Sequence, residues 1–259
     1  MKTSRFLLAL LVLLYVFLLG PFLVIFIASF GEEATLVFPP RGFSLMWFQK
    51  VFSVRMFRDA FWTSLEVAIA ATISALVLGT PVAYALVRFR FRGQNAMEVA
   101  FASPVIVPGL VIGFALLRYF VLWGNFPILL GLYLGHTAIL FPYTVRVVSA
   151  SLRNFDPAVE EAAISLGASR LRSFFLIVMP NIRSGFLAAF ILAFITSFNN
   201  VPVSLFLTGP GVATLPIQML LYMEYYFDPT IAALSTLIII FTILVVQTAE
   251  RVLGISRFV

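Results

Sequence analysis

The sequence predicts an all-α integral membrane protein with six transmembrane helices. Of its 259 residues, 62% are hydrophobic and 11% are charged, whereas soluble domains carry about 25% charged residues. The apolar residues form continuous runs near the length that crosses a bilayer as a helix, about 20 residues, and not the short alternating segments of a transmembrane β-barrel. Long helices also pair their own backbone polar groups, as hydrocarbon requires.

Six apolar runs define the expected spans. They cover residues 6–30, 61–87, 97–123, 127–149, 186–207 and 231–250. The first run is longer than the apolar region of a cleavable signal peptide, about 7–15 residues, so we expect it to remain as a helix. Prolines inside the spans, Pro108 and Pro202 among them, predict kinks because proline removes a backbone donor.

The basic residues predict the orientation. With the N-terminus inside, most of the 17 lysines and arginines lie in cytoplasmic segments, and Arg88, Arg90 and Arg92 share one short loop. Both termini are then cytoplasmic, residues 31–60 form an outer loop, and residues 150–185 form a cytoplasmic loop between spans four and five. Topology therefore accounts for the net charge of +6, and we expect no nucleic-acid partner.

Aromatic residues mark the outer face and small residues mark helix contacts. Trp47, Phe48, Val51 and Phe52 predict a short helix lying on the membrane surface. Two glycine pairs with G-x-x-x-G spacing permit close helix approach, namely Gly109 with Gly113 and Gly131 with Gly135.

The cytoplasmic loop carries local signals for a helix, a sharp turn and a second helix. Asp156 and Pro157 are typical of a helix start, since aspartate caps exposed N–H groups and proline is tolerated at the first helical position. Gly167 predicts a left-handed stop. A second helix is expected over 169–179, ending at Pro180.

The first of these helices has features of a docking element. Glu160 and Glu161 lie in its first turns, favourably for the helix dipole, and Ala162 and Ala163 give it a thin face that suits a groove on a partner. Arg170 and Arg172 follow the turn and are placed to pair with partner carboxylates. The alternative is a surface loop with ordinary caps.

The spacing of this loop resembles the EAA loop of binding-protein-dependent ABC importer permeases of type I. The match consists of Glu161-Ala162-Ala163, Gly167, Ile177 and Pro180, with Met179 where the family usually has leucine. Residues 104–113 and 197–211, followed by 214–216, resemble the spermidine/putrescine-type permeases. The resemblance covers residues 61–253.

The resemblance implies one permease domain over 1–259, with a cytoplasmic coupling helix between helices four and five. It implies a second permease subunit, identical or different, two cytoplasmic ABC ATPases that use ATP and Mg, and an extracytoplasmic solute-binding protein at the bacterial inner membrane. The residues it assigns to ATPase coupling are Asp156, Glu160, Glu161, Ala162, Ala163, Gly167, Arg170, Arg172 and Pro180.

The transported solute stays open at this point. Polyamine members often carry acidic residues after the Ser-Phe of span five, where this chain has Asn199 and Asn200. A carboxylate favours a cation and an amide does not, so a polyamine, an opine or an amino-acid-like solute are all compatible. Ser197, Asn199 and Asn200 are the candidate translocation residues, and interhelical hydrogen bonding is the alternative role.

The remaining polar residues predict no chemistry by this chain. Glu66 is expected to face a partner permease or lipid headgroups. His136 is the only histidine and there is no cysteine, so we expect a structural histidine and no metal or other cofactor. A Walker A sequence is absent, so ATP hydrolysis belongs to another polypeptide. An autonomous secondary transporter is the alternative function, although such proteins usually show internal repeats and we find none.

Overall fold

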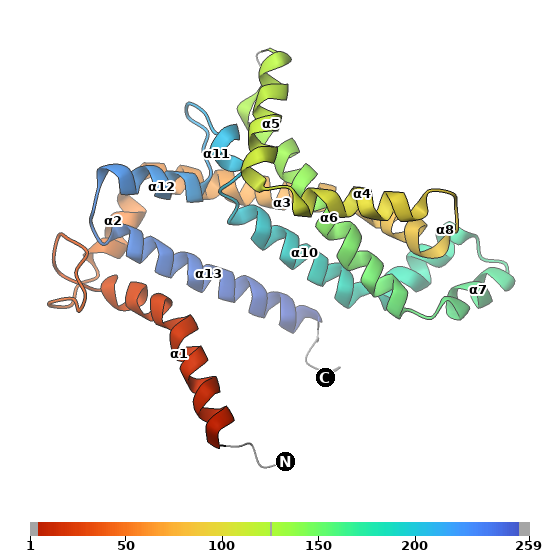
Figure 1. The fold of residues 1–259 in the computed structure, drawn as a ribbon, viewed down its shortest axis with the longest axis horizontal. Coiled ribbons are helices and arrows are strands. Elements are labelled where there is room, and N and C mark those ends of the chain that lie inside the picture. The colour runs from red at the N-terminus through yellow and green to blue at the C-terminus, as the bar shows by residue number, and fades with distance from the viewer. Residues whose placement is uncertain (1–4, 125, 254–259) are drawn as a thin grey trace. The chain divides into compact units, whose positions relative to one another are not determined.

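The computed structural model describes residues 5–124 and 126–253, and that part of the chain is almost entirely helical (Figure 1). Its helices are α1 (Arg5–Ala28), α2 (Met46–Ser53), α3 (Arg55–Arg88), α4 (Gln94–Ile106), α5 (Gly109–Leu122), α6 (Ile128–Asn154), α7 (Pro157–Ser165), α8 (Arg170–Ser173), α9 (Met179–Asn181), α10 (Arg183–Phe198), α11 (Ser204–Leu207), α12 (Leu215–Tyr225) and α13 (Thr230–Leu253). A π-helical turn, Phe174–Val178, joins α8 to α9.

Four helices within the described residues are long and apolar enough to cross a membrane. They are α1, α3, α6 and α13, and the bent pair formed by α8–α9 and α10 makes a fifth if it is counted as one span. The all-α membrane architecture predicted from composition is confirmed. The expected count of six continuous spans is not reproduced, because two of the six apolar runs do not form single helices.

Those two runs are interrupted where proline and asparagine occur. The run 97–123 divides into α4 and α5, and Pro108 precedes α5 in an extended conformation. The run 186–207 divides into α10 and α11, with Pro202 in the break. Proline cannot donate a backbone hydrogen bond, and at these positions it accompanies a break where the sequence predicted a kink.

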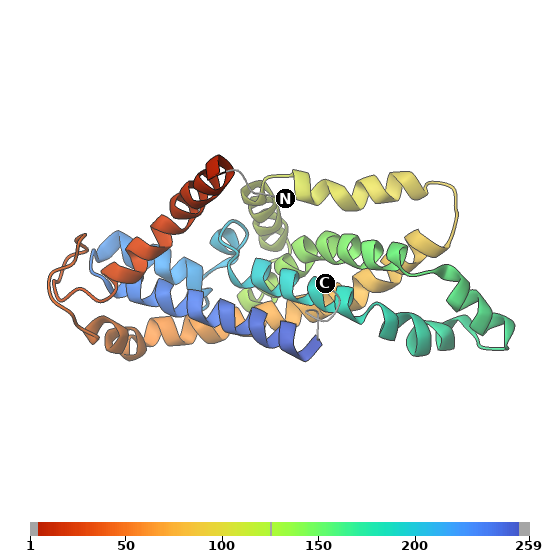
Figure 2. The same ribbon diagram turned by 90° about the horizontal axis from the view of Figure 1, so that it is seen from below.

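The chain forms two compact units, residues 60–217 with 245–259 and residues 1–59 with 218–244. In the larger unit, α6 packs against both α4 and α10 (Figures 1 and 2). Its core at one end joins α3, α6 and the segment leading into α10, through Leu76, Ala83, Leu86, Val145, Val148, Leu152, Val178, Ile182 and Ala189. Burial of these apolar side chains positions the α7–α8 segment beyond the helix ends.

The smaller unit contains α1 and α2. The expected short helix in the outer loop is present as α2, but Trp47 and Val51 are buried, and the Trp47 indole N–H donates to the Gly31 carbonyl at 2.8 Å. Of the two phenylalanines in α2, Phe52 is exposed and Phe48 is half-buried. The amphipathic pattern therefore buries one face of α2 within the protein, in place of the bilayer contact that the sequence predicted.

Candidate functional site

The predicted start and stop of the first helix in the loop of residues 150–185 are confirmed. Asp156 caps α7, its carboxylate accepting from the Ala158 N–H at 2.9 Å. Gly167 has φ +95°, and its N–H donates to the Ile164 carbonyl. A side chain at that φ would be strained, so the sharp turn after α7 depends on this glycine.

The sequence predicted that the second helix of this loop, over 169–179, ends at Pro180, and this prediction is wrong. Pro180 lies inside α9, and the chain turns only at Ile182, where α10 begins at an angle of 75° to the preceding segment. In a regular α-helix the ring of Pro180 would collide with the Leu176 carbonyl. The preceding π-helical turn, in which the Met179 N–H bonds to the Phe174 carbonyl, widens the backbone at that point.

An apolar stripe runs along the exposed side of α7. Val159, Ala162, Ala163 and Leu166 follow the i, i+3, i+4, i+7 pattern of one helix face, and Leu166 is 90% exposed. Glu161 is exposed beside this stripe. Our sequence reasoning missed Leu166, although the leucine just before a glycine stop was a usable signal.

Charged residues after the turn border the same segment. Arg170 and Arg172 are both exposed, as predicted for residues that meet a partner. The Arg170 guanidinium also lies over the Phe89 ring, 5.3 Å from its centroid. The exposed stripe thus has acidic and basic groups close to it along the chain.

Glu160 points the opposite way from the stripe. Its side chain is only 5% exposed, and its carboxylate accepts from the Arg88 Nε at 3.0 Å and from the Tyr84 hydroxyl. The resemblance assigns both glutamates to ATPase coupling, but only Glu161 lies on the surface, and Glu160 faces the interior of the protein. Neither Arg88 nor Tyr84 was singled out from the sequence as a partner of this loop.

The candidate translocation residues lie at the far end of α10 from α7. Ser197 is buried and bonds to His136 Nδ1 at 2.7 Å, while His136 Nε2 bonds to Ser204 at 3.0 Å. The histidine thus joins α6, α10 and α11. The Asn199 amide donates to the Ile195 carbonyl, and Asn200 Oδ1 accepts from the Val203 N–H. These amides stabilise the break between the two helices.

An acidic residue lines a pocket on the larger unit. The pocket has a volume of about 330 Å³ and is lined by Glu66, Val67, Ala70, Pro127, Leu129, Leu130 and Tyr133. Glu66 is exposed there on a helix long and apolar enough to cross a membrane. Ionisable groups on such helices usually mark a pathway or a partner contact. The described residues contain no group of three or more histidine, aspartate or glutamate side chains that could hold a metal ion.

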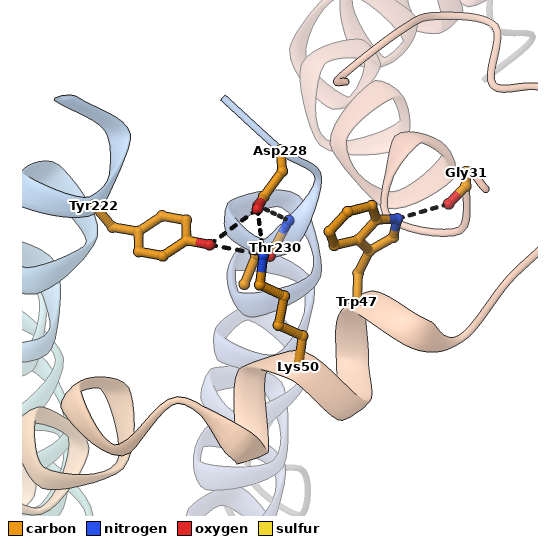
Figure 3. A network of polar contacts seen from close by, with 6 residues as sticks. All are labelled: Gly31, Trp47, Lys50, Tyr222, Asp228 and Thr230. Atoms are coloured by element: carbon orange, nitrogen blue, oxygen red, sulfur yellow. Dashed lines mark hydrogen bonds and ion pairs between the residues drawn. The ribbon is translucent and has the colours of Figure 1, made fainter. Parts of the chain in front are cut away.

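A polar network within the smaller unit links α2 to α12 and to the start of α13 (Figure 3). Lys50 of α2 reaches Asp228 at 2.6 Å, and Asp228 also accepts from the Tyr222 hydroxyl and the Thr230 N–H, each at 3.0 Å. The hydrogen bond to Asp228 raises the pKa of Lys50 above its ordinary value. Burial alone would raise the pKa of Asp228, but the bonds from Lys50, Thr230 and Tyr222 outweigh it and hold that pKa below its ordinary value.

We expect Asp228→Asn to destabilise the smaller unit by about 1–3 kcal/mol, because it removes a charged acceptor from three donors. The lowered pKa of Asp228 means that its contribution is complete above the ordinary value of 3.8 and is lost as the pH falls below it. The raised pKa of Lys50 means that its contribution is complete below 10.5 and is lost above that pH.

Thermal denaturation in detergent from pH 3 to pH 9 checks this prediction. The difference between wild type and Asp228→Asn should stay constant across neutral pH and shrink below pH 3.8. Glu33→Gln is the matched control, since its pair with Arg41 is long, at 3.8 Å, and exposed, and such pairs contribute about 0–1 kcal/mol. A variant as stable as wild type at pH 7 contradicts the role of the network.

The long apolar helices and the capped helix α7, between α6 and α8, indicate a multi-pass membrane protein. Residues 75–254 match the family described as "Binding-protein-dependent transport system inner membrane component", and the chain belongs to that family. It is therefore a multi-pass permease component of an ABC importer in the inner membrane.

Several relatives are named as permeases of putrescine or spermidine/putrescine transport systems. The chain is 34% identical to "Putrescine transport system permease protein PotI" of Escherichia coli (strain K12), over 87% of this chain and 82% of that protein. It is 28% identical to "Spermidine/putrescine transport system permease protein PotC" of Haemophilus influenzae (strain ATCC 51907 / DSM 11121 / KW20 / Rd), over 96% of this chain and 97% of that protein.

Solved structures share the fold. A chain of a bacterial ABC transporter that imports the acidic polysaccharide alginate superposes with a TM-score of 0.72 at 19% identity, covering 94% of this chain and 93% of that one. A chain of the MetNI methionine ABC transporter gives 0.64 at 19% identity, covering 77% and 95%. These likenesses confirm the predicted permease architecture.

Proposed function

We propose that a cytoplasmic ATPase drives this permease through α7. The observation that carries the proposal is the apolar stripe of Val159, Ala162, Ala163 and Leu166, in which Ala163 is half-buried and the other three residues are exposed. The segment that carries the stripe, between α6 and α10, is too polar to face lipid. Short helices with anchors at i, i+3, i+4 and i+7 bind hydrophobic grooves. The EAA spacing of the same residues supports an ATPase as the owner of that groove.

The assembly that we propose contains this chain, a second permease subunit, two cytoplasmic ATPases and an extracytoplasmic binding protein. ATP and Mg are bound by the ATPases. Both termini and α7 face the cytoplasm, which agrees with Arg88, Arg90 and Arg92 near the cytoplasmic end of α3. Glu161, Arg170 and Arg172 then border the docked stripe and pair with charges at the rim of the groove.

The path from α7 to the membrane helices is short. α7 leads through Gly167, α8 and the π-helical turn to α10, and the bend of 75° before α10 converts a displacement along the membrane surface into a tilt of α10. ATP-driven closure of the two ATPases supplies that displacement, and hydrolysis reverses it. The device is a two-state transition of packed helices.

We propose that the solute is a polyamine-type cation. The names of PotI and PotC support this class, and the Glu66 carboxylate lines a pocket of about 330 Å³ together with Tyr133. The amides of Asn199 and Asn200 add no negative charge, and they favour the competing assignment of an opine or an amino-acid-like solute.

Reconstitution of the whole complex in proteoliposomes tests the proposed function. Uptake of radiolabelled putrescine, presented with the binding protein outside, is expected only when ATP and an active ATPase are present inside. A catalytically inactive ATPase is the matched control. Uptake by this chain alone under an ion gradient would instead establish a secondary transporter, and ATP-dependent uptake of a different solute would overturn the polyamine assignment alone.

A further inference from the structure

A buried polar cluster joins α7 to the end of α3. Glu160 contributes its carboxylate, Arg88 its Nε at 3.0 Å, and Tyr84 its hydroxyl. Arg88 Nη2 also donates to the carbonyl of Phe155 at 3.2 Å, and the guanidinium lies over the Phe155 ring. One arginine therefore holds the last turn of α3, the link between α6 and α7, and α7 itself.

Aromatic rings enclose this cluster. The Tyr84 ring packs edge-on against Phe89, just after α3, and against Phe174, in the π-helical turn, with centroids 6.0 and 5.1 Å apart. The side chains of Glu160 and Arg88 are 5% and 11% exposed, so water screens the pair little. The cluster thus ties α7 to α3 and also borders the segment that leads to α10.

Burial of this ion pair needs an explanation other than stability. Desolvation of two charges can exceed the attraction between them, so buried ion pairs are weak evidence for stabilisation, and their best-attested use is to fix register. Apolar residues of similar size would hold α7 against α3 without a unique register. Arg88 donates to two acceptors at once, the Glu160 carboxylate and the Phe155 carbonyl, and this pair of bonds specifies a single position of α7.

The position of α7 on α3 matters because α3 also carries Glu66, which lines the pocket described above. α3 is one continuous helix from Arg55 to Arg88. Pro81 lies between Glu66 and Arg88, but the helix stays unbroken there, so a displacement imposed on Arg88 reaches Glu66 without crossing a break. In contrast, the route through α8–α9 into α10 contains a π-helical turn and a break, which absorb part of the motion.

We propose that Glu160, Arg88 and Tyr84 are positioning residues that transmit the displacement of α7 to α3, giving the coupling segment a second route into the membrane through one continuous helix. The proposal rests on the coupling role proposed for α7. It assigns the two neighbouring glutamates different tasks: Glu161 lies on the ATPase-facing surface, and Glu160 faces inward and holds α7 on α3.

Transport stoichiometry in the whole complex tests the proposal. In proteoliposomes with the binding protein, Glu160→Gln should still capture the ATPase and hydrolyse ATP, but solute imported per ATP should fall at least tenfold. Glu98→Gln is the matched control, because it breaks the exposed pair of Glu98 with Arg153 (2.9 Å) without touching the cluster. An unchanged stoichiometry in Glu160→Gln overturns the proposal. Failure of wild-type α7 to bind the ATPase overturns the proposed function instead.

A distance measurement keeps the proposal testable if Glu160→Gln assembles poorly. The chain has no cysteine, so spin labels at Arg90→Cys and Ser165→Cys report the separation of the α3 end and α7. In the wild-type background this distance should be the same with and without trapped ATP, and Tyr84→Phe should broaden its distribution. A wild-type distance that changes between the two states shows that α7 slides on α3 and overturns the proposal.

Discussion

Leu166→Asp is expected to abolish stable association between this permease and its ATPase. Leu166 is 90% exposed at the end of α7 and is the largest side chain of the apolar stripe that we propose enters the ATPase groove. An aspartate there would carry an unpaired carboxylate into an apolar groove. Truncation of a central anchor typically costs about 2–4 kcal/mol, which corresponds to roughly a hundredfold weaker binding.

Capture of the ATPase by tagged permease in detergent measures this loss. Leu45→Asp is a matched control, because it makes the same change at an exposed leucine of the outer loop, 52% exposed, and should leave capture unchanged. Glu161→Lys should weaken capture less, by about tenfold, since it alters a charge at the edge of the stripe. Wild-type recovery of the ATPase by Leu166→Asp would place the docking surface elsewhere on the chain.

The loop of residues 150–185 shows which features can be predicted from neighbouring residues alone. Asp156 and Gly167 predict their conformations because capping and positive φ depend on neighbouring backbone alone, and both predictions are confirmed. Glu160 and Glu161 are chemically identical, so the sequence offers no reason to separate them. Their environments differ because Glu160 bonds to Arg88, which lies 72 positions earlier in the chain. Only the packing of α3 against the loop reveals that contact.

In the long apolar helices, too, some features can be predicted from the sequence and others cannot. The runs that became α1, α3, α6 and α13 are predictable because apolar composition over about 20 residues determines a span. Hydropathy does not show where the backbone changes direction. The breaks beside Pro108 and Pro202 and the helical position of Pro180 depend on which backbone groups find another partner. Examples are the Phe174 carbonyl in the π-helical turn before Pro180 and the Val203 N–H at Asn200.

The translocation residues were the least predictable. Ser197 was chosen because a polar group in a span is costly, and its hydroxyl proves to be bonded to His136. Ser197 and His136 can each be identified as polar residues of apolar segments, but nothing in the sequence pairs positions 61 residues apart. The asparagines likewise bond to nearby backbone, which agrees with a structural task at the break between α10 and α11.

Gly113→Val is expected to prevent stable packing of α5 and so to give the largest loss of folded protein. A Cβ at Gly113 would lie 2.8 Å from the Pro202 carbonyl oxygen and 3.1 Å from the Val203 Cα. These are backbone atoms that cannot rotate away, so α5 must separate from the break between α10 and α11. Inserted methyl groups in packed cores typically cost about 1–3 kcal/mol, and a rigid β-branched side chain against backbone should reach or exceed the upper value.

The same change at Gly20 isolates packing from helix propensity. Gly20 lies in α1, where a Cβ would meet no atom within 4 Å, so Gly20→Val carries the same propensity change without the collision. The yield of monodisperse protein and the midpoint of thermal denaturation should fall sharply for Gly113→Val, fall less for Gly113→Ala and stay near wild type for Gly20→Val. Equal midpoints for the two valine variants would mean that α5 does not rest on Pro202, and the G-x-x-x-G pair at 109 and 113 would then have no role in bringing these segments together.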